Sequence, residues 1–84
     1  MYYFYVLENE QGELYYGSTR NLKQRIFEHK QGRVPSTKAN TYTLVYYEAY
    51  GSETDARNRE HQIKCHGQAK RWLKERIKNS LRQG

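Results

Sequence analysis

The sequence has little of what would cross-link a small fold or place it in a membrane. It contains a single cysteine, Cys65, which excludes an internal disulfide and a zinc site built from several cysteines. No apolar run approaches the roughly 20 residues that span a bilayer, and no signal peptide heads the chain. These absences predict a soluble protein of a reducing compartment such as the cytoplasm, with no membrane partner.

Apolar residues are also scarce, at 36% of the 84 residues, but nine tyrosines add bulk. Tyrosine can bury its ring while its hydroxyl group reaches a partner or water. A chain of this length buries only about 60–65% of its unfolded surface. We therefore expect a single domain over residues 1–84 with a modest core that is rich in aromatic rings.

Acidic residues are too few to balance the basic ones. Lysine and arginine number 15 against nine aspartates and glutamates, which gives a net charge of +6. Six basic residues and one acid lie within residues 20–38, and six and one lie within residues 66–84. Such clusters favour a polyanionic partner, most simply nucleic acid. The alternative is that these side chains only solvate helix faces.

Two aromatic-rich segments with strand character open the chain, at residues 2–8 and 13–17. The four-residue break between them, residues 9–12, suits a hairpin loop. Apolar or aromatic side chains occupy both faces of the first segment, so we expect it to be covered on both sides at the centre of a sheet. Gly17 is expected to adopt a backbone conformation closed to other residues and to turn the chain into a helix.

The remainder of the chain predicts three helices and a third strand. Asn21 is a good N-cap for a helix that ends before Gly32. Residues 43–50 have strong strand propensity, and Ser52 is expected to cap a second helix. A final helix should follow Gly67. The order predicts an α+β fold, with a central three-stranded antiparallel sheet flanked by helices in the order β-β-α-β-α-α.

Charged residues lie among apolar positions in these helices. At about 100° per residue, Arg25 and His29 fall on the same face as Leu22 and Ile26. Glu60 likewise falls between apolar positions of the second helix, where a carboxylate is costly to bury unless it is paired or metal-bound. This pattern indicates a site beside the tyrosines. In the final helix, by contrast, we expect Trp72 to be a core anchor.

The order and spacing of these residues resemble the GIY-YIG nuclease family in its small stand-alone form. Tyr3-Phe4-Tyr5 stands where the family has Gly-Ile-Tyr, and Tyr15-Tyr16-Gly17 stands where it has Tyr-Ile-Gly. The later matches are Arg25 with the family's arginine, His29 with a histidine of many members, and Glu60 with the metal-binding glutamate. The resemblance covers roughly residues 1–72, and the chain departs from it in lacking the leading Gly and Ile.

The resemblance implies a metal-dependent endonuclease that hydrolyses phosphodiester bonds in DNA. Tyr5 would be the general base, with Tyr15 and His29 stabilising its phenolate, because free tyrosine has a pKa near 10 and is a poor base at neutral pH. Arg25 would hold the scissile phosphate through its planar donor fork. Glu60 would bind one Mg²⁺ or Mn²⁺ ion, a hard cation suited to carboxylate, water and phosphate oxygens.

A second set of residues is expected to bind substrate around this site: Gly17, Lys23, Lys30, Ser36, Thr37 and Lys38. The last three belong to a polar, basic loop that could equally be a simple connector, and the two helical lysines could equally support the fold. Whether the DNA is single-stranded, branched or duplex is left open. A partner protein or a homodimer is left open as well.

Each of these roles has a structural alternative. The tyrosines could be ordinary strand aromatics, His29 a satisfied boundary histidine, and Arg25 with Glu60 an ion pair between helices. Zinc at Glu60, His61, Cys65 and His66 is disfavoured, because the first two are adjacent and no further ligand is evident. For the whole protein, the alternatives are a non-catalytic basic nucleic-acid-binding module on the same fold and a protein-interaction domain with a vestigial site.

Overall fold

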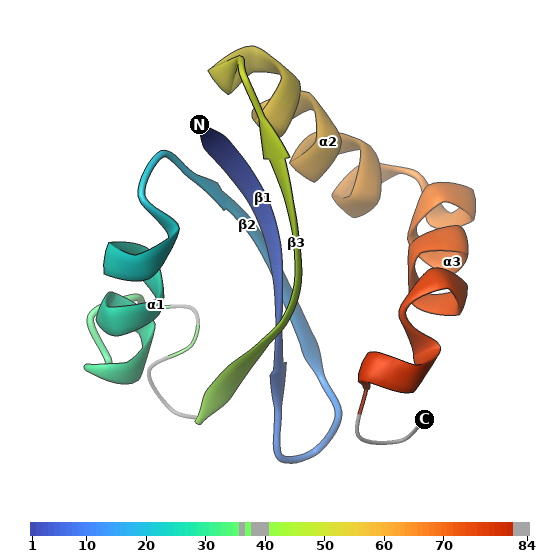
Figure 1. Cartoon of the computed structure of the whole chain (residues 1–84). Coiled ribbons are helices and arrows are strands. Elements are labelled where there is room, and N and C mark those ends of the chain that lie inside the picture. The colour runs from blue at the N-terminus through green and yellow to red at the C-terminus, as the bar shows by residue number, and fades with distance from the viewer. Residues whose placement is uncertain (36, 38–40, 82–84) are drawn as a thin grey trace.

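The fold is a three-stranded antiparallel sheet with helices on both faces (Figure 1). The computed structural model describes residues 1–35, 37 and 41–81. Its elements are β1 (Tyr2–Asn9), β2 (Leu14–Thr19), α1 (Leu22–Lys30), β3 (Tyr42–Tyr50), α2 (Glu53–Cys65), α3 (Gly67–Arg76) and a 3-10 turn (Lys78–Ser80). The strand order is β2-β1-β3. The predicted fold class, element order and central first strand are confirmed.

The alternation of side chains along β1 divides its residues between two layers. Phe4 and Val6 face α2 and α3, whereas Tyr5 faces α1. Figure 1 shows α1 on one side of the sheet and the other two helices on the opposite side. No helix within the described ranges is both long and apolar enough to cross a bilayer.

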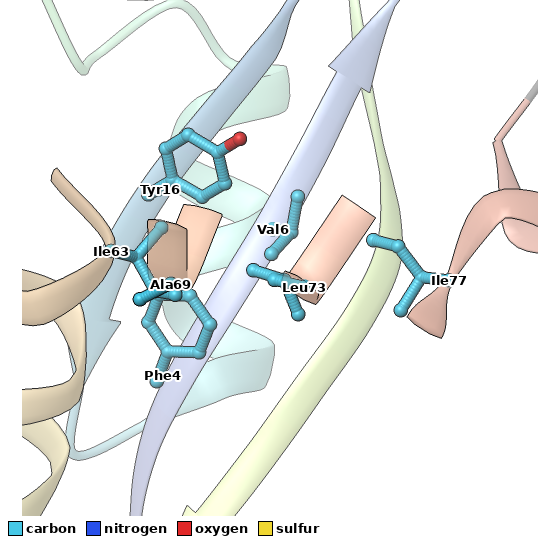
Figure 2. Packing of buried hydrophobic residues seen from close by; sticks show 7 residues of the cluster. All are labelled: Phe4, Val6, Tyr16, Ile63, Ala69, Leu73 and Ile77. Carbon is cyan, nitrogen blue, oxygen red and sulfur yellow. The ribbon is translucent and has the colours of Figure 1, made fainter. Parts of the chain in front are cut away.

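The hydrophobic core lies between the sheet and the α2–α3 pair. Figure 2 shows its buried members, which are Phe4, Val6, Tyr16, Ile63, Ala69, Leu73 and Ile77. At roughly 25 cal/mol per Å² of apolar area removed from water, such side chains supply the main stabilising contribution. Beside it on the same face, Arg59 of α2 pairs with Glu48 of β3 at 3.0 Å, and Glu48 also accepts a hydrogen bond from the Tyr46 hydroxyl group.

The prediction that Trp72 anchors the core is wrong, because its side chain is 65% exposed. Three smaller residues spaced four apart, Ala69, Leu73 and Ile77, face the sheet instead. At about 100° per residue, Trp72 lies beside that row and points away from the core. Helical spacing alone did not show whether the row that contains Leu73 or the adjacent row that contains Trp72 would face the sheet.

The hairpin turn and the two ends of α1 follow the predicted chemistry, whereas the start of α2 does not. Gly12 closes the hairpin with a φ of 82°, and Gly32 follows α1 with a φ of 72°, both in the left-handed region that glycine adopts readily. Asn21 accepts a hydrogen bond from the Gln24 backbone N–H at 3.0 Å, as an N-cap should. Ser52 occupies the N-cap position of α2, but its side chain makes no capping hydrogen bond.

Candidate active site

A chain of hydrogen bonds runs from the sheet through α1 to the loop that follows it. The hydroxyl oxygen of Tyr5 lies 2.9 Å from His29 Nε2, and His29 Nδ1 lies 2.8 Å from Thr37 Oγ1. All three residues are buried, with exposed fractions of 1%, 5% and 1%. Thr37, which follows α1 in the chain, therefore holds the histidine in place.

The direction of these hydrogen bonds follows from the partners of the Thr37 hydroxyl group. The Thr37 hydroxyl group donates to the carbonyl oxygen of Val34 at 3.4 Å, so it can accept from His29 Nδ1–H. The remaining ring nitrogen, Nε2, is then the acceptor for the Tyr5 hydroxyl group. We assign His29 this tautomer, in which its free lone pair points at the phenol.

The environment of these groups keeps both of them neutral. Burial raises the pKa of Tyr5 to about 12, although the neighbouring Arg25 guanidinium lowers it in part; the charge of Glu60 adds a small further increase. Burial also lowers the pKa of His29, and the charge of Arg25 lowers it further. At neutral pH the pair is therefore a phenol that faces an unprotonated imidazole.

Gly17 allows the Tyr5 ring to take this position. It lies in β2 directly opposite Tyr5, and a Cβ atom built on it would be only 2.5 Å from the Tyr5 hydroxyl oxygen. The expected special backbone conformation is wrong, because Gly17 is not among the described glycines with positive φ. Its role is to make room, since a side chain here would displace the phenol.

Tyr15 and Arg25 complete this side of the site. The Tyr15 ring centroid is 6.3 Å from that of Tyr5 and 5.1 Å from that of His29, the latter in an edge-to-face arrangement. The Arg25 side chain is 37% exposed and pairs with Glu28 at 3.1 Å, one helical turn along. One of its guanidinium nitrogens thus has a fixed partner, and the rest of the fork can face an incoming anion.

Glu60 reaches the same region from α2. One carboxylate oxygen accepts from the Ser18 hydroxyl group at 2.6 Å, and the other accepts from the Lys64 ammonium group at 2.7 Å. The Lys64 nitrogen also lies 5.9 Å from the centroid of the Tyr15 ring, within the range of a cation–π contact. Because β2 is an edge strand, Lys64 of α2 can reach the Tyr15 ring around the edge of the sheet.

Glu60 fits a metal site with one protein ligand. The described residues contain no group of three or more histidine, cysteine, aspartate or glutamate side chains that could enclose an ion. Glu60 is partly accessible, with 23% of its side chain exposed, and a carboxylate has about four lone-pair positions, of which two are used. A hard divalent ion could bind here if water and phosphate oxygens supplied its other ligands.

The structure gathers four of the five predicted catalytic residues in one cluster and connects the fifth, Glu60, to that cluster through Lys64. Tyr5, Tyr15, Arg25 and His29 surround one another on the α1 face, and Glu60 joins them at the β2 edge. The alternative ion pair between Arg25 and Glu60 is wrong, because each pairs within its own helix.

The predicted substrate-binding residues separate into different surroundings. Lys23 and Lys30 are exposed on α1 and line a groove beside it, whereas Gly17 is buried under Tyr5. The Thr37 hydroxyl group is also buried and occupied by His29, so it positions the histidine and does not present itself to a phosphate. Ser36 and Lys38 lie outside the described residues.

Sequence reasoning missed two residues of this site, Ser18 and Lys64. A signal existed for Lys64, since it follows Glu60 by four positions and such pairs attract on a helix. Nothing local indicated Ser18, whose contact with Glu60 joins residues 42 positions apart.

Comparison with known proteins gives one consistent answer. A family model described as the GIY-YIG catalytic domain matches residues 1–78. A UPF0213 protein of Pediococcus acidilactici is 39% identical over 83 residues, covering 92% of this chain and 78% of its own. One of Natronomonas pharaonis is 38% identical over 72 residues, covering 83% and 85%. One of Bacillus pumilus is 32% identical over 74 residues, covering 86% and 76%. No solved structure matches.

Proposed function

Because this chain belongs to the GIY-YIG family and is similar to UPF0213 proteins over most of their length, we propose that it is a metal-dependent endonuclease that cleaves DNA. A GIY-YIG domain implies nuclease activity in general and a nucleic-acid substrate. The observation that carries the finer proposal is the buried contact of 2.9 Å between the Tyr5 hydroxyl group and His29 Nε2. This contact supports a role for Tyr5, the tyrosine that matches the family's motif, as the general base together with His29.

Tyr5 and His29 would activate water together. A phenol with a pKa of about 12 is almost wholly protonated at neutral pH, so a free phenolate is not the working base. The Tyr5 oxygen instead accepts a proton from water while its own proton passes to His29 Nε2. The water oxygen forms the new bond to phosphorus, and His29 carries the proton as an imidazolium.

Thr37 and Arg25 would support this transfer from either end. The Thr37 oxygen accepts from His29 Nδ1–H and so keeps the lone pair of Nε2 directed at the phenol. Arg25 lies beside the phenol with part of its donor fork exposed, where it can bind two oxygens of the scissile phosphate. It would stabilise the negative charge that increases on those oxygens during attack.

Glu60 would hold the divalent ion. Family members generally use such metals, and the ion, when bound, would polarise the phosphate and stabilise the departing oxygen. The Ser18 hydroxyl group fixes one Glu60 oxygen, which orients the other toward the Lys64 ammonium group. Glu60 would hold the ion through the oxygen that now accepts from Lys64.

A cleavage assay with matched variants tests the proposal. Labelled single-stranded, branched and duplex DNA would be incubated with Mg²⁺ or Mn²⁺ and either the wild-type protein, Arg25→Ala or Glu60→Ala. We expect cleavage by the wild type and a loss of roughly 100-fold or more in each variant, as when one transition-state contact is removed. Arg57→Ala and Glu75→Ala, which remove exposed residues of the same types from helical ion pairs, should cleave normally.

Two results would contradict the mechanism. Cleavage that survives both Arg25→Ala and Glu60→Ala would show that these residues do not form the active site. Salt-sensitive DNA binding without cleavage under either metal, unaffected by Glu60→Ala, would identify the alternative, a non-catalytic binding module.

A further inference from the structure

A groove lies on the same face of the sheet as Tyr5, between α1 and β3. This groove has a volume of about 600 Å³, which is within the range of small-molecule sites of roughly 300–1,000 Å³. Its walls include the rings of Tyr3, Phe27 and Tyr47, and its rim includes Arg20, Lys23 and Lys30. None of these residues takes part in the hydrogen-bond chain of Tyr5 and His29.

The aromatic walls of the groove are unusually open to solvent. Phe27 is 49% exposed and Tyr47 is 52% exposed, whereas the other large aromatic side chains of the sheet and α1 are more deeply placed. Tyr3, which also lines the groove, meets Tyr47 edge to face with ring centroids 5.9 Å apart. Exposed rings gathered around a hollow are typical of surfaces that bind flat apolar ligands.

The rim of the groove carries charge of a single sign. Arg20, Lys23 and Lys30 form no ion pair with any acid in the described part of the chain, and no acidic residue lines the groove. Three cations around aromatic walls are complementary to a ligand that combines phosphate groups with flat rings. A nucleotide is such a ligand, because each base has a π-face and each linkage has one negative charge.

We propose that this groove binds an unpaired nucleotide of the substrate strand, with the base stacked on Phe27 and Tyr47 and the flanking phosphates on Lys23, Lys30 and Arg20. The inference rests on the nucleic-acid substrate of the proposed function and refines it to single-stranded or locally unpaired substrates. Bases of an intact duplex are stacked on each other and cannot offer a face to these rings.

The position of the groove relates it to the candidate active site. Tyr47 is the direct cross-strand partner of Tyr5, so one wall of the groove adjoins the residue proposed as general base. Along α1, Lys23, Phe27 and Lys30 line the groove, while Arg25 and His29 occupy the neighbouring flank. A nucleotide held in the groove would place its strand beside the hydrolytic groups.

Equilibrium binding without divalent metal tests the groove separately from catalysis. A short fluorescein-labelled oligothymidine strand and a duplex of the same length would be titrated in EDTA and followed by fluorescence anisotropy. Phe27→Ala combined with Tyr47→Ala should weaken binding of the strand about 5- to 150-fold, the loss of one stacked base. It should leave duplex binding nearly unchanged. The control is Trp72→Ala, which removes an even more exposed aromatic residue from basic α3.

Salt dependence provides a second readout on the rim. For a single strand the slope of log K against log salt is about −0.7 per neutralised phosphate, so Lys23→Gln with Lys30→Gln should make the slope shallower by roughly 1.4. Lys74→Gln with Lys78→Gln, on the other side of the molecule, should have a smaller effect if the groove is the principal strand site.

Three results would overturn the inference: unchanged strand binding in the aromatic double variant, an equal loss for strand and duplex, or a larger loss in Trp72→Ala. A dimer that the aromatic double variant abolishes in sedimentation would also overturn it, by assigning the groove to a second copy of the chain. If the wild type never cleaves but its strand binding depends on the two aromatic residues, only the nuclease proposal is contradicted. If the wild type cleaves and the aromatic double variant binds the strand as tightly as the wild type, only the groove proposal is contradicted.

Discussion

The two faces of the sheet are built from different chemistry. Toward α2 and α3, β1 presents Phe4 and Val6 to aliphatic residues such as Leu73, and packing holds that layer together. Toward α1, the same strand presents Tyr5, whose buried hydroxyl group requires the hydrogen bond that His29 supplies. Residues one position apart on β1 therefore belong to a hydrophobic core and to a polar aromatic cluster.

This division shows how a small domain can hold reactive groups without losing its fold. The α1 face contains a buried phenol, imidazole and hydroxyl group, and such groups stabilise only when every partner is present. The opposite face provides hydrophobic burial that does not depend on them. Changes on the α2–α3 face should therefore alter stability first, and changes on the α1 face should alter chemistry first.

The largest expected change in stability comes from truncating the core layer. Leu73→Ala should lower the free energy of unfolding by about 2–5 kcal/mol, because it removes a fully buried side chain and leaves a cavity. Its neighbour Trp72→Ala should change it by no more than about 0.5 kcal/mol, because that side chain is exposed. Urea denaturation followed by circular dichroism measures both, and equal costs would contradict the assignment of this layer.

An intermediate effect should come from Gly17→Ala, which acts on both stability and chemistry. The added methyl group would collide with the Tyr5 phenol, so we expect a loss of about 1–3 kcal/mol and a fall of roughly 100-fold in cleavage, as for a misplaced catalytic group. Gly51→Ala is the matched control, since a Cβ atom there meets nothing within 4 Å. A fully active Gly17→Ala protein would show that the position of the phenol does not matter.

The polar layer should also make stability depend on pH. His29 has a lowered pKa in the folded state, so between its ordinary value near 6.5 and that lower value the unfolded chain binds more protons. Stability should therefore be fully present above about pH 6.5 and fall as the pH drops through the folded pKa. Cleavage should fall in the same window, because an imidazolium cannot accept the Tyr5 proton.

The free energy of unfolding would be measured by chemical denaturation at a series of pH values for the wild type and for His29→Gln. The variant should lose the part of the pH dependence of stability that comes from His29. His66→Gln, at an exposed histidine, should retain it. A wild-type profile identical to that of His29→Gln would show that His29 does not titrate as proposed.

The smallest expected effect is a gain. The Tyr16 hydroxyl group is buried without a hydrogen-bond partner among the described residues, and burial raises its pKa. Tyr16→Phe should therefore stabilise the protein by roughly 1 kcal/mol or leave it unchanged. Tyr46→Phe should destabilise it, because the Tyr46 hydroxyl group donates to Glu48 at 2.7 Å. Thermal unfolding should give a lower midpoint for Tyr46→Phe and an equal or higher midpoint for Tyr16→Phe, and a lower midpoint in both variants would contradict this reading.

Local patterns predicted the fold, since alternation, capping residues and turn glycines act over a few positions. Asn21 and the position of β1 in the sheet are examples. The prediction was wrong for Trp72 and for the backbone at Gly17, because both depend on which side chain approaches from another element. Hydrophobic spacing does not specify which of two adjacent helical rows meets the sheet.

The candidate site was predicted in part for the same reason. Ordered spacings along the chain identified Tyr5, Arg25, His29 and Glu60. They did not reveal that Thr37 would turn inward to His29, because that contact forms only in the folded protein. The family resemblance implied a phenolate, whereas burial raises the pKa of Tyr5 to about 12, and the proposed mechanism therefore passes the phenol proton to His29.

The central claim, that the Tyr5 hydroxyl group relays a proton from water to His29, is tested most directly by DNA cleavage with Tyr5→Phe. The ring and its packing remain, and only the oxygen that contacts His29 Nε2 is lost. The account predicts a rate about 10²- to 10⁴-fold lower, with circular dichroism unchanged. A folded Tyr5→Phe protein that cleaves DNA at the wild-type rate would contradict it.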